Sequence, residues 1–240
     1  MTENKKGKLF LIPTYLGENM AYEVLPTSVK EVTAKLTHFI AENEKTARRF
    51  IKQILPDKKQ SELSFDWLNK HTSANEIPGF LNKCLSGENI GLLSEAGCPG
   101  IADPGAEVVA MAHQSNIQVV PLVGPSSIIL TMMSSGLNGQ NFAFNGYLPI
   151  DKHEKKQQIK KLERISSEIE QVQIFIETPY RNDKLFDLFL QVLHPQTLLC
   201  IGCDVSLESE FIKTKTIAEW QKNKPDLHKK PAIFIFQKKV

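Results

Sequence analysis

Short apolar runs alternate with amphipathic segments through the first half of the chain. A short apolar run predicts a buried strand, and apolar positions three or four apart predict a helix. The predicted strands are Leu9–Ile12, Phe39–Ala41, Ile90–Leu93 and Ile117–Val120. The predicted helices are residues 28–38, 47–55, 75–86 (with Leu81 and Leu85 facing inward) and 105–115. This alternation is typical of an α/β fold with a mostly parallel sheet and helices on both faces.

The second half of the chain has a different pattern, because its last strands follow one another without long crossovers. The predicted helices are residues 126–135, 152–170 (with an apolar stripe at Ile159, Leu162, Ile165 and Ile169), 182–193 and 217–222. The predicted strands are Phe142–Phe144, Val172–Ile176, Thr197–Ile201, Glu210–Lys213 and Ala232–Phe236. Adjacent late strands predict antiparallel pairing, and therefore a mixed sheet. We expect two α/β domains, residues 1–123 and 124–240, that join near Val123–Pro125.

Composition and charge narrow the class of protein. The chain has 240 residues, of which 41% are hydrophobic and 23% are charged, an ordinary globular composition. The net charge of +2 is too close to zero for a strongly basic nucleic-acid binder, so any such surface has to be a local patch. No stretch reaches the roughly 18 apolar residues of a membrane span. We therefore expect a cytoplasmic protein with no membrane partner.

The spacing of cysteine and histidine gives no support for a metal site. Cys200 and Cys203 lie in an apolar strand pattern, where side chains three residues apart point to opposite faces. A core pair is therefore favoured over redox or metal chemistry. The Lys-rich segment 152–164 alternates with Glu and Gln, which is typical of a solvated helix face. Trp67 and Trp220 are expected to be packing residues.

The segment from Ser94 to Gly105 is the most informative loop. It directly follows a predicted strand and precedes a predicted helix, and ligands of open α/β sheets bind outside the carboxyl ends of the strands. Gly97 and Gly100 let the backbone approach a ligand closely or adopt positive φ. Asp103 can cap the following helix. A plain connection between strand and helix is the alternative, but the length of the loop and its Gly and Pro content favour binding.

Two other strand ends carry polar groups. Gly124–Ser127 places two hydroxyls at a helix start, where they can cap the helix or donate to a carboxylate or a ribose. Ile176–Arg181 places Glu177 at a strand end, as a base, a ribose contact or only a cap, and capping is favoured without further context. Neither G-x-G-x-x-G nor G-x-x-x-x-G-K-[ST] occurs in the Ser94–Gly105 loop, so the expected ligand is recognised by backbone and shape.

Taken together, these strand ends match a known family. The segments that carry the likeness are, in family order, Leu11–Gly17, Ser94–Pro99 with Asp103–Gly105, Val119–Ser127, Gly146–Pro149 and Glu177–Arg181. The chain resembles the tetrapyrrole (corrin/porphyrin) methylase family of S-adenosylmethionine-dependent methyltransferases. Within that family it is most similar to the branch that methylates a ribose 2′-hydroxyl of a cytidine in small-subunit ribosomal RNA. The likeness runs from about Lys8 to Phe236.

The resemblance implies a two-domain enzyme, commonly a homodimer, with S-adenosylmethionine folded in the cleft between the domains. The cofactor-binding positions it implies are Ala96, Gly97, Pro99, Ile101, Ala102, Ser126, Ser127, Tyr147, Thr178, Asp204, Val205, Pro231 and Ala232. A sulfonium already makes its methyl group electrophilic, so the protein mainly supplies orientation. A hydroxyl nucleophile also benefits from a proton acceptor. Glu177 is our first candidate for that catalytic role, and Asp103 is the second.

The substrate side departs from the pattern of the ribosomal branch. Glu42–Lys45 stands where the branch has an acidic-Asp-Thr-Arg stretch, and Cys203–Leu207 stands where it has an Arg-Glu-Leu-Thr-Lys-like segment. The second change removes two basic residues that can contact phosphates. The match ends close to Val240, where many members continue, so we expect a shorter paralogue.

Three hypotheses about function follow from this comparison. The first is O-methylation of RNA. The second is methylation of a tetrapyrrole or another small molecule, although the Pro13–Gly17 loop lacks the Gly-x-Gly-Pro-Gly-Asp pattern of porphyrinoid methylases. The third is a non-catalytic module that binds S-adenosylmethionine.

Overall fold

The chain forms two compact units. The computed structural model describes residues 5–68, 72–73 and 75–239. The first unit consists of Met1–Tyr15 and Glu23–Pro125, and the second consists of Leu16–Tyr22 and Ser126–Val240. The boundary thus lies two residues beyond the expected one, and residues 16–22 belong to the second unit rather than the first.

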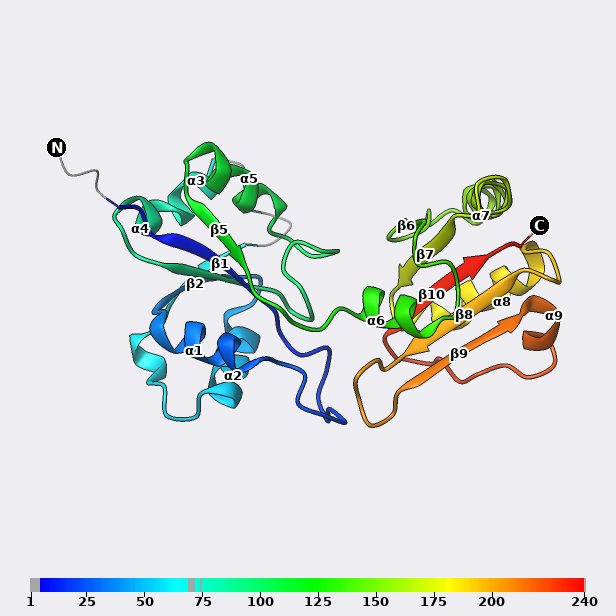
Figure 1. Ribbon diagram of the computed structural model, residues 1–240, viewed down its shortest axis with the longest axis horizontal. Helices are drawn as coiled ribbons and strands as arrows, with labels where there is room; N and C mark the ends of the chain where they lie inside the picture. Colours follow the sequence, from blue (N-terminus) through cyan, green and yellow to red (C-terminus); the bar gives the residue numbers. More distant parts are fainter. Residues whose placement is uncertain (1–4, 69–71, 74, 240) are drawn as a thin grey trace. The chain divides into compact units, whose positions relative to one another are not determined.

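A parallel five-stranded sheet forms the centre of the first unit, with the strand order β3-β2-β4-β1-β5. Its strands are β1 (Lys8–Ile12), β2 (His38–Ala41), β3 (Ser64–Trp67), β4 (Ile90–Leu93) and β5 (Gln118–Pro121). One face is covered by α1 (Thr27–Lys35) and α2 (Glu44–Ile54), and the other by α3 (Ile77–Phe80), α4 (Asn82–Leu85) and α5 (Ala106–Gln114) (Figure 1). The short 3-10 helix η1 (Gln60–Glu62) precedes β3. The expected α/β architecture is confirmed.

In the first unit one strand was not expected, and three expectations are wrong. No apolar run indicated β3, because this strand lies at the edge of the sheet and all four of its residues are half-buried or exposed. The expected helix 75–86 is split into α3 and α4, since Leu81 leaves helical geometry with φ −95° and ψ 1°. Leu85 is consequently 43% exposed instead of facing inward. Trp67 is 62% exposed on the edge strand and is not a core packing residue.

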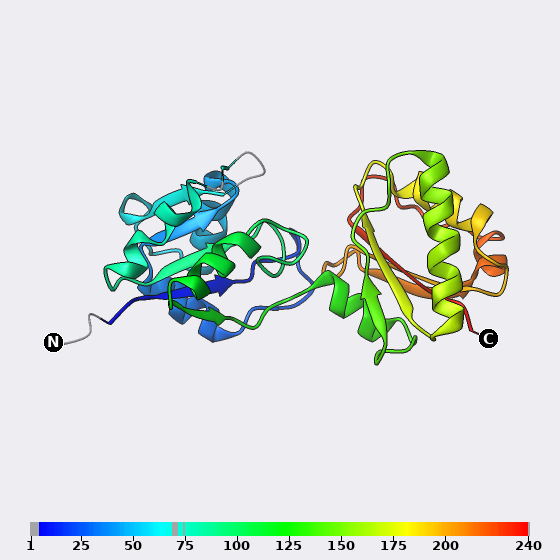
Figure 2. The same ribbon diagram turned by 90° about the horizontal axis from the view of Figure 1, so that it is seen from above.

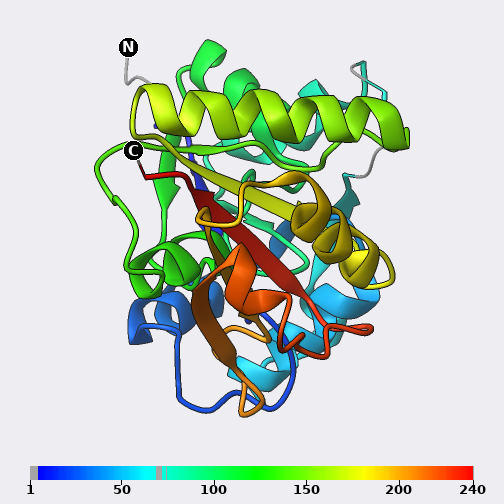
Figure 3. The same ribbon diagram turned by 90° about the vertical axis from the view of Figure 1, so that its right-hand side faces the viewer.

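A mixed five-stranded sheet forms the centre of the second unit, with the strand order β6-β7-β10-β8-β9. Its strands are β6 (Phe142–Phe144), β7 (Val172–Glu177), β8 (Leu198–Cys203), β9 (Phe211–Thr216) and β10 (Ala232–Gln237). The β6–β7 pair is parallel, and the pairs that involve β8, β9 and β10 are antiparallel, as expected. One face carries α7 (Lys152–Glu168), α8 (Asn182–Val192) and α9 (Ile217–Trp220), and the other carries α6 (Ser127–Ser134) (Figures 2 and 3).

The two faces of this sheet account for the cysteine pair. Cys203 packs in the apolar cluster under α7, α8 and α9, whereas Cys200 packs in the cluster under α6. Their side chains therefore lie on opposite faces, as the spacing predicted. Trp220 is fully buried, and its indole N–H donates to the carbonyl of Leu199 at 2.8 Å. Ile169 is 55% exposed, because it is the C-cap of α7 and not part of the helix stripe.

The segment Leu16–Tyr22 is held in the second unit by backbone hydrogen bonds. Ala21 donates its N–H to the carbonyl of Ser206 at 3.1 Å, and Glu208 donates its N–H to the carbonyl of Asn19 at 3.0 Å. An isolated β-bridge joins Met20 to Leu207 in the same place.

Two kinds of feature are missing from the described residues. None of their helices combines the length and the apolar character needed to cross a membrane. Within the same residues, no group of three or more His, Cys, Asp or Glu side chains is arranged to hold a metal ion.

Candidate functional site

Three loops meet at the carboxyl edge of the first sheet. β1 lies between β4 and β5, so the chain segments that leave these strands emerge side by side. Thr14, which follows β1, exchanges backbone hydrogen bonds with Gly97, at 2.9 and 3.3 Å. Ser94 Oγ donates to the carbonyl of Gly97 at 2.6 Å, and Cys98 Sγ donates to the carbonyl of Pro125 at 3.4 Å. The loop 94–105 is therefore fixed to both neighbouring strand ends.

The backbone of this loop adopts conformations that ordinary residues avoid. The φ angles of Gly97, Gly100 and Gly105 are 79°, 75° and 137°. Ala102 also has a positive φ, 62°, although it carries a Cβ. Such strain persists only where the surroundings enforce it, and it concentrates at ligand sites. Gly105 occupies the N-cap of α5, where no side chain accepts a capping hydrogen bond, so the expected cap from Asp103 is wrong.

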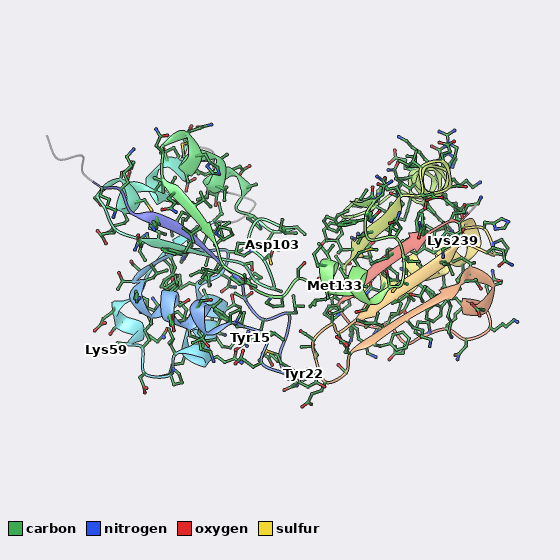
Figure 4. The ribbon with its side chains drawn as sticks, viewed as in Figure 1. Tyr15, Tyr22, Lys59, Asp103, Met133 and Lys239 are labelled. Carbon is green, nitrogen blue, oxygen red and sulfur yellow. The ribbon has the colours of Figure 1, made fainter. Side chains whose placement is uncertain are left out.

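Asp103 belongs to a group of negatively charged side chains at this edge of the first sheet (Figure 4). Partial burial raises the pKa of its carboxyl to about 6, with additional contributions from the negative charges of Glu42 and Glu95. Three carboxylates thus lie near one another at the carboxyl ends of β2 and β4. Thr46 Oγ1 holds one of them by donating to Glu95 at 2.7 Å. A cationic ligand relieves the mutual repulsion of such a group.

One edge of the second sheet gathers most of the remaining predicted positions. The register places Ala232, the first residue of β10, opposite both Glu177 at the end of β7 and Cys203 at the end of β8. Tyr147 reaches the same edge, because Gly146 accepts a hydrogen bond from the backbone N–H of Ile176 at 3.1 Å. The residues that follow β7 and β8 therefore lie beside the residues that precede β10.

Ser126 and Ser127 begin α6. The side chain of Ser126 caps this helix by accepting from the backbone N–H of Ile129 at 3.4 Å, as the capping alternative predicted. α6 lies directly on the sheet at Gly202, where an added Cβ would be 2.4 Å from Thr131 Oγ1. Glycine at position 202 is what permits this close approach.

Glu177 is the centre of a buried ion-pair cluster. Its side chain is 1% exposed, and Oε1 accepts from Arg181 Nη2 at 2.6 Å and from the backbone N–H of Thr178 at 2.7 Å. Lys155 Nζ lies 3.6 Å from Oε2. Because donors engage Oε1 and the ammonium group of Lys155 lies near Oε2, the geometry favours a positioning role for Glu177 over proton acceptance.

Asp204 follows β8 in a second strained segment. It has a φ of 51°, and Ser206 has a φ of 71°. The backbone N–H of Asp204 donates to the carbonyl of Pro231 at 3.0 Å, and Ser209 Oγ donates to Asp204 Oδ2 at 2.9 Å. Val205 is buried. These contacts fix the positions of Asp204 and Pro231 relative to each other.

The predicted residues therefore form two groups, one on each unit. The first unit carries Ala96, Gly97, Pro99, Ile101, Ala102 and Asp103 on one loop. The second unit carries Ser126, Ser127, Tyr147, Glu177, Thr178, Asp204, Val205, Pro231 and Ala232. Ile101 and Tyr147 are 53% and 56% exposed, so both large side chains are available to a ligand.

Sequence reasoning did not single out the polar residues that support these groups. Thr14 was the first polar residue after an apolar strand, which was a usable signal. Lys155 lies four residues before Ile159, on the buried stripe of α7, and that spacing was the signal for its burial. Asn182 donates from Nδ2 to the carbonyl of Lys230 at 2.6 Å, across 48 residues, and nothing in the local sequence indicates this contact.

Relatives of known name resemble the chain along its sequence. No model of a protein family matches it. "Ribosomal RNA small subunit methyltransferase I" from Bacillus subtilis is 31% identical over 215 residues, which cover 89% of this chain and 68% of the relative. The protein of that name from Buchnera aphidicola is 28% identical, over 97% of this chain and 78% of the relative. The one from Vibrio cholerae is 31% identical over 152 residues, and there the chain spans about half, 51%, of the relative's length.

Solved structures share the fold at low sequence identity. The methyltransferase CobJ has a TM-score of 0.63 at 12% identity, with 95% of this chain and 93% of that chain covered. Uroporphyrin-III C-methyltransferase from Thermus thermophilus, in complex with S-adenosylhomocysteine, has a TM-score of 0.59 at 13% identity, with 97% and 98% covered. The fold is thus that of the tetrapyrrole methylases. With the Bacillus relative above, the chain belongs to the family of ribosomal RNA small subunit methyltransferase I, whose members are S-adenosylmethionine-dependent methyltransferases.

Proposed function

We propose that the protein transfers the methyl group of S-adenosylmethionine to a ribose 2′-hydroxyl of small-subunit ribosomal RNA. The observation that carries this proposal is sequence identity of about 30% to relatives named as ribosomal RNA small subunit methyltransferases. In the proposal, residues of both units hold the cofactor, the enzyme works as a homodimer, and the reaction takes place in the cytoplasm.

The charges at the first sheet fit this cofactor. S-adenosylmethionine carries a positive sulfonium and a positive ammonium group, and the sulfonium makes the attached methyl group electrophilic. The carboxylates of Asp103, Glu42 and Glu95 supply the opposite sign at one sheet edge. The strained backbone at Ala102 and Asp204 supports the assignment, because such conformations let backbone groups approach a ligand closely.

A ribose hydroxyl loses its proton when it attacks a methyl group, so a nearby acceptor accelerates transfer. Asp103 is the better candidate for this role. With a pKa of about 6, it is ionised in most molecules at pH 7 and still holds a proton more strongly than an ordinary aspartate. We assign Glu177 to the support of the strand end instead, through its contacts with Arg181 and Lys155.

Two measurements test the proposal in sequence. Isothermal titration calorimetry of the full chain with S-adenosylmethionine should give saturable binding, and its absence at about millimolar cofactor refutes the enzyme assignment. Incubation with methyl-labelled cofactor and unmodified small ribosomal subunits should then place label on the RNA, and nuclease digestion should release a 2′-O-methylated nucleoside. Label on a base instead of a ribose contradicts the 2′-hydroxyl assignment.

A tetrapyrrole acceptor is the second candidate, because solved structures with the same fold include uroporphyrin-III methyltransferases. The same labelled cofactor is therefore offered with a precorrin mixture in a parallel reaction. Label in the tetrapyrrole and not in the RNA selects this alternative. Cofactor binding without transfer to RNA, to precorrins or to any component of a cell lysate selects the non-catalytic module.

A further inference from the structure

A basic hollow of about 360 Å³ lies in the second unit, between the first turn of α7 and the length of α8. Its walls include Lys152, Lys155, Arg181, Lys184, Asp187 and Leu188. The volume is within the range of pockets that hold small molecules or single nucleotides. In the sequence, segment 152–164 suggested only a solvated helix face, but Lys155 is 13% exposed and turned into the protein.

The positive charge of the hollow is incompletely neutralised. The acidic wall residue, Asp187, already pairs with Lys224 at 2.6 Å. Among the described residues, no ion pair or hydrogen bond is present at the side chains of Lys152 and Lys184. The hollow thus presents a surplus of cations to whatever enters it.

The inner part of the wall, where Lys155 is 13% exposed, supports the same conclusion. Lys155 and Arg181 both pair with the single carboxylate of Glu177. Withdrawing an ammonium group from water costs free energy that a shared carboxylate at 3.6 Å offsets only in part. An anion in the hollow would supply the missing countercharge.

A second basic hollow, beside β9, has a simpler explanation. Its walls include Lys213 and Lys215 on β9, the edge strand of the sheet, and Lys215 stacks over Trp220 at 4.6 Å from the ring centroid. Lysines on an edge strand prevent pairing with a second sheet. None of the described residues that line the hollow between α7 and α8 belongs to a strand, so this explanation does not apply to it.

We infer that the hollow between α7 and α8 binds a backbone phosphate of the RNA substrate. This inference rests on the proposed function and adds a site at which the protein binds the RNA backbone. Lysine and arginine side chains neutralise phosphates and fix the register of a nucleic acid. Leu188 and Ile150 provide apolar contacts for the adjoining ribose or base. Glu177 joins the hollow to the sheet edge that carries Thr178 and Ala232, so a phosphate held here lies beside the candidate cofactor residues.

Matched charge reversals test the inference. The first double variant is K152E/K184E in the hollow, and the control is K160E/K161E on exposed positions of the same helix α7, about 12 Å further along it. Both carry the same change in charge. Glutamate in the first turn of a helix is favourable, so the hollow variant should fold, which circular dichroism and calorimetric titration with S-adenosylmethionine verify.

The probe is a fluorescein-labelled small-subunit RNA transcript, titrated by anisotropy at several salt concentrations. We expect the hollow variant to bind about tenfold more weakly at low salt, and the plot of log K against log salt to flatten by about 1.4 for two lost contacts. The control should match the unmodified protein, and both should bind S-adenosylmethionine equally.

The outcomes separate this inference from the proposed function. If both double variants lose RNA affinity equally, or if neither loses it, the phosphate site is refuted. RNA methylation by the unmodified protein still supports the proposed function in that case. Absence of both RNA binding and RNA methylation in the unmodified protein overturns both. Loss confined to K152E/K184E, with cofactor binding intact, supports the site.

Discussion

Asp103→Asn should stabilise the protein at neutral and alkaline pH. The wild-type carboxyl has a pKa raised from 3.8 to about 6, and each pH unit corresponds to about 1.4 kcal/mol. The shift of about two units therefore corresponds to about 3 kcal/mol for a fully shielded group. Asp103 is only half-buried, and solvent screening reduces the expected gain to about 1–1.5 kcal/mol. Asparagine removes the charge that burial, Glu42 and Glu95 disfavour, and keeps the size of the side chain.

The stability difference between wild type and Asp103→Asn should depend on pH. A raised pKa means that the folded protein binds the proton more tightly than the unfolded chain does. Below about pH 4 both states carry the proton, so wild type and variant should be equally stable. Between about pH 4 and pH 6 the wild type loses stability relative to the variant, and above about pH 6 the difference is complete.

Urea unfolding at pH 4, 6 and 8, followed by circular dichroism, measures this difference. The control is Asp57→Asn, an exposed aspartate of the same unit, which should change the free energy of unfolding by less than about 0.5 kcal/mol. A destabilised Asp103→Asn variant, or a gain that is the same at pH 4 and pH 8, refutes the electrostatic description of this edge.

Three further predictions follow from the same structure. If S-adenosylmethionine binds at the carboxylates around Asp103, its affinity should rise up to about fivefold between pH 5 and pH 7.5. The affinity of S-adenosylhomocysteine, which lacks the sulfonium, should rise less, and equal pH dependence of the two compounds in calorimetry contradicts this. Gly202→Ala should cost about 1–3 kcal/mol because of the contact with Thr131, and Thr131→Ala should restore part of that loss in a double-mutant cycle; additive losses in urea unfolding contradict it. Arg181→Met should destabilise the fold by about 2 kcal/mol, since the buried carboxylate of Glu177 loses its closest cation; an unchanged unfolding midpoint contradicts it.

Much of the fold could be predicted because buried strands produce apolar runs. β4 is buried at all four positions and β10 at all six, and both were found from their residues alone. β3 was missed for the complementary reason: an edge strand with polar Ser64 and Asp66 has no apolar run. The break at Leu81 was missed because it depends on backbone angles that the apolar spacing does not encode.

The loops that form the candidate site could be predicted from the sequence. Strand ends rich in Gly and Pro indicated where it lies, and the register of β7, β8 and β10 then brought the second group of residues together. Charge was not predictable from one sequence. The pKa of Asp103 depends on Glu42 and Glu95, which lie 61 and 8 residues away along the chain. One cation on Glu177, Arg181, lies only four residues further along the chain, but the other, Lys155, comes from α7. The basic hollow depends on both and was therefore not visible in the local sequence.

Because Leu16–Tyr22 belongs to the second unit, it affects the folding of the chain during synthesis and the fragments into which the protein can be cut. This segment leaves the ribosome early, yet its hydrogen-bonding partners, Ser206 and Glu208, are synthesised more than 180 residues later. The segment therefore lacks these partners until nearly the whole chain exists. A single proteolytic cut after Pro125 would leave its two fragments joined by the β-bridge between Met20 and Leu207. A recombinant fragment that begins at Ser126 would lack a strip of its own structure.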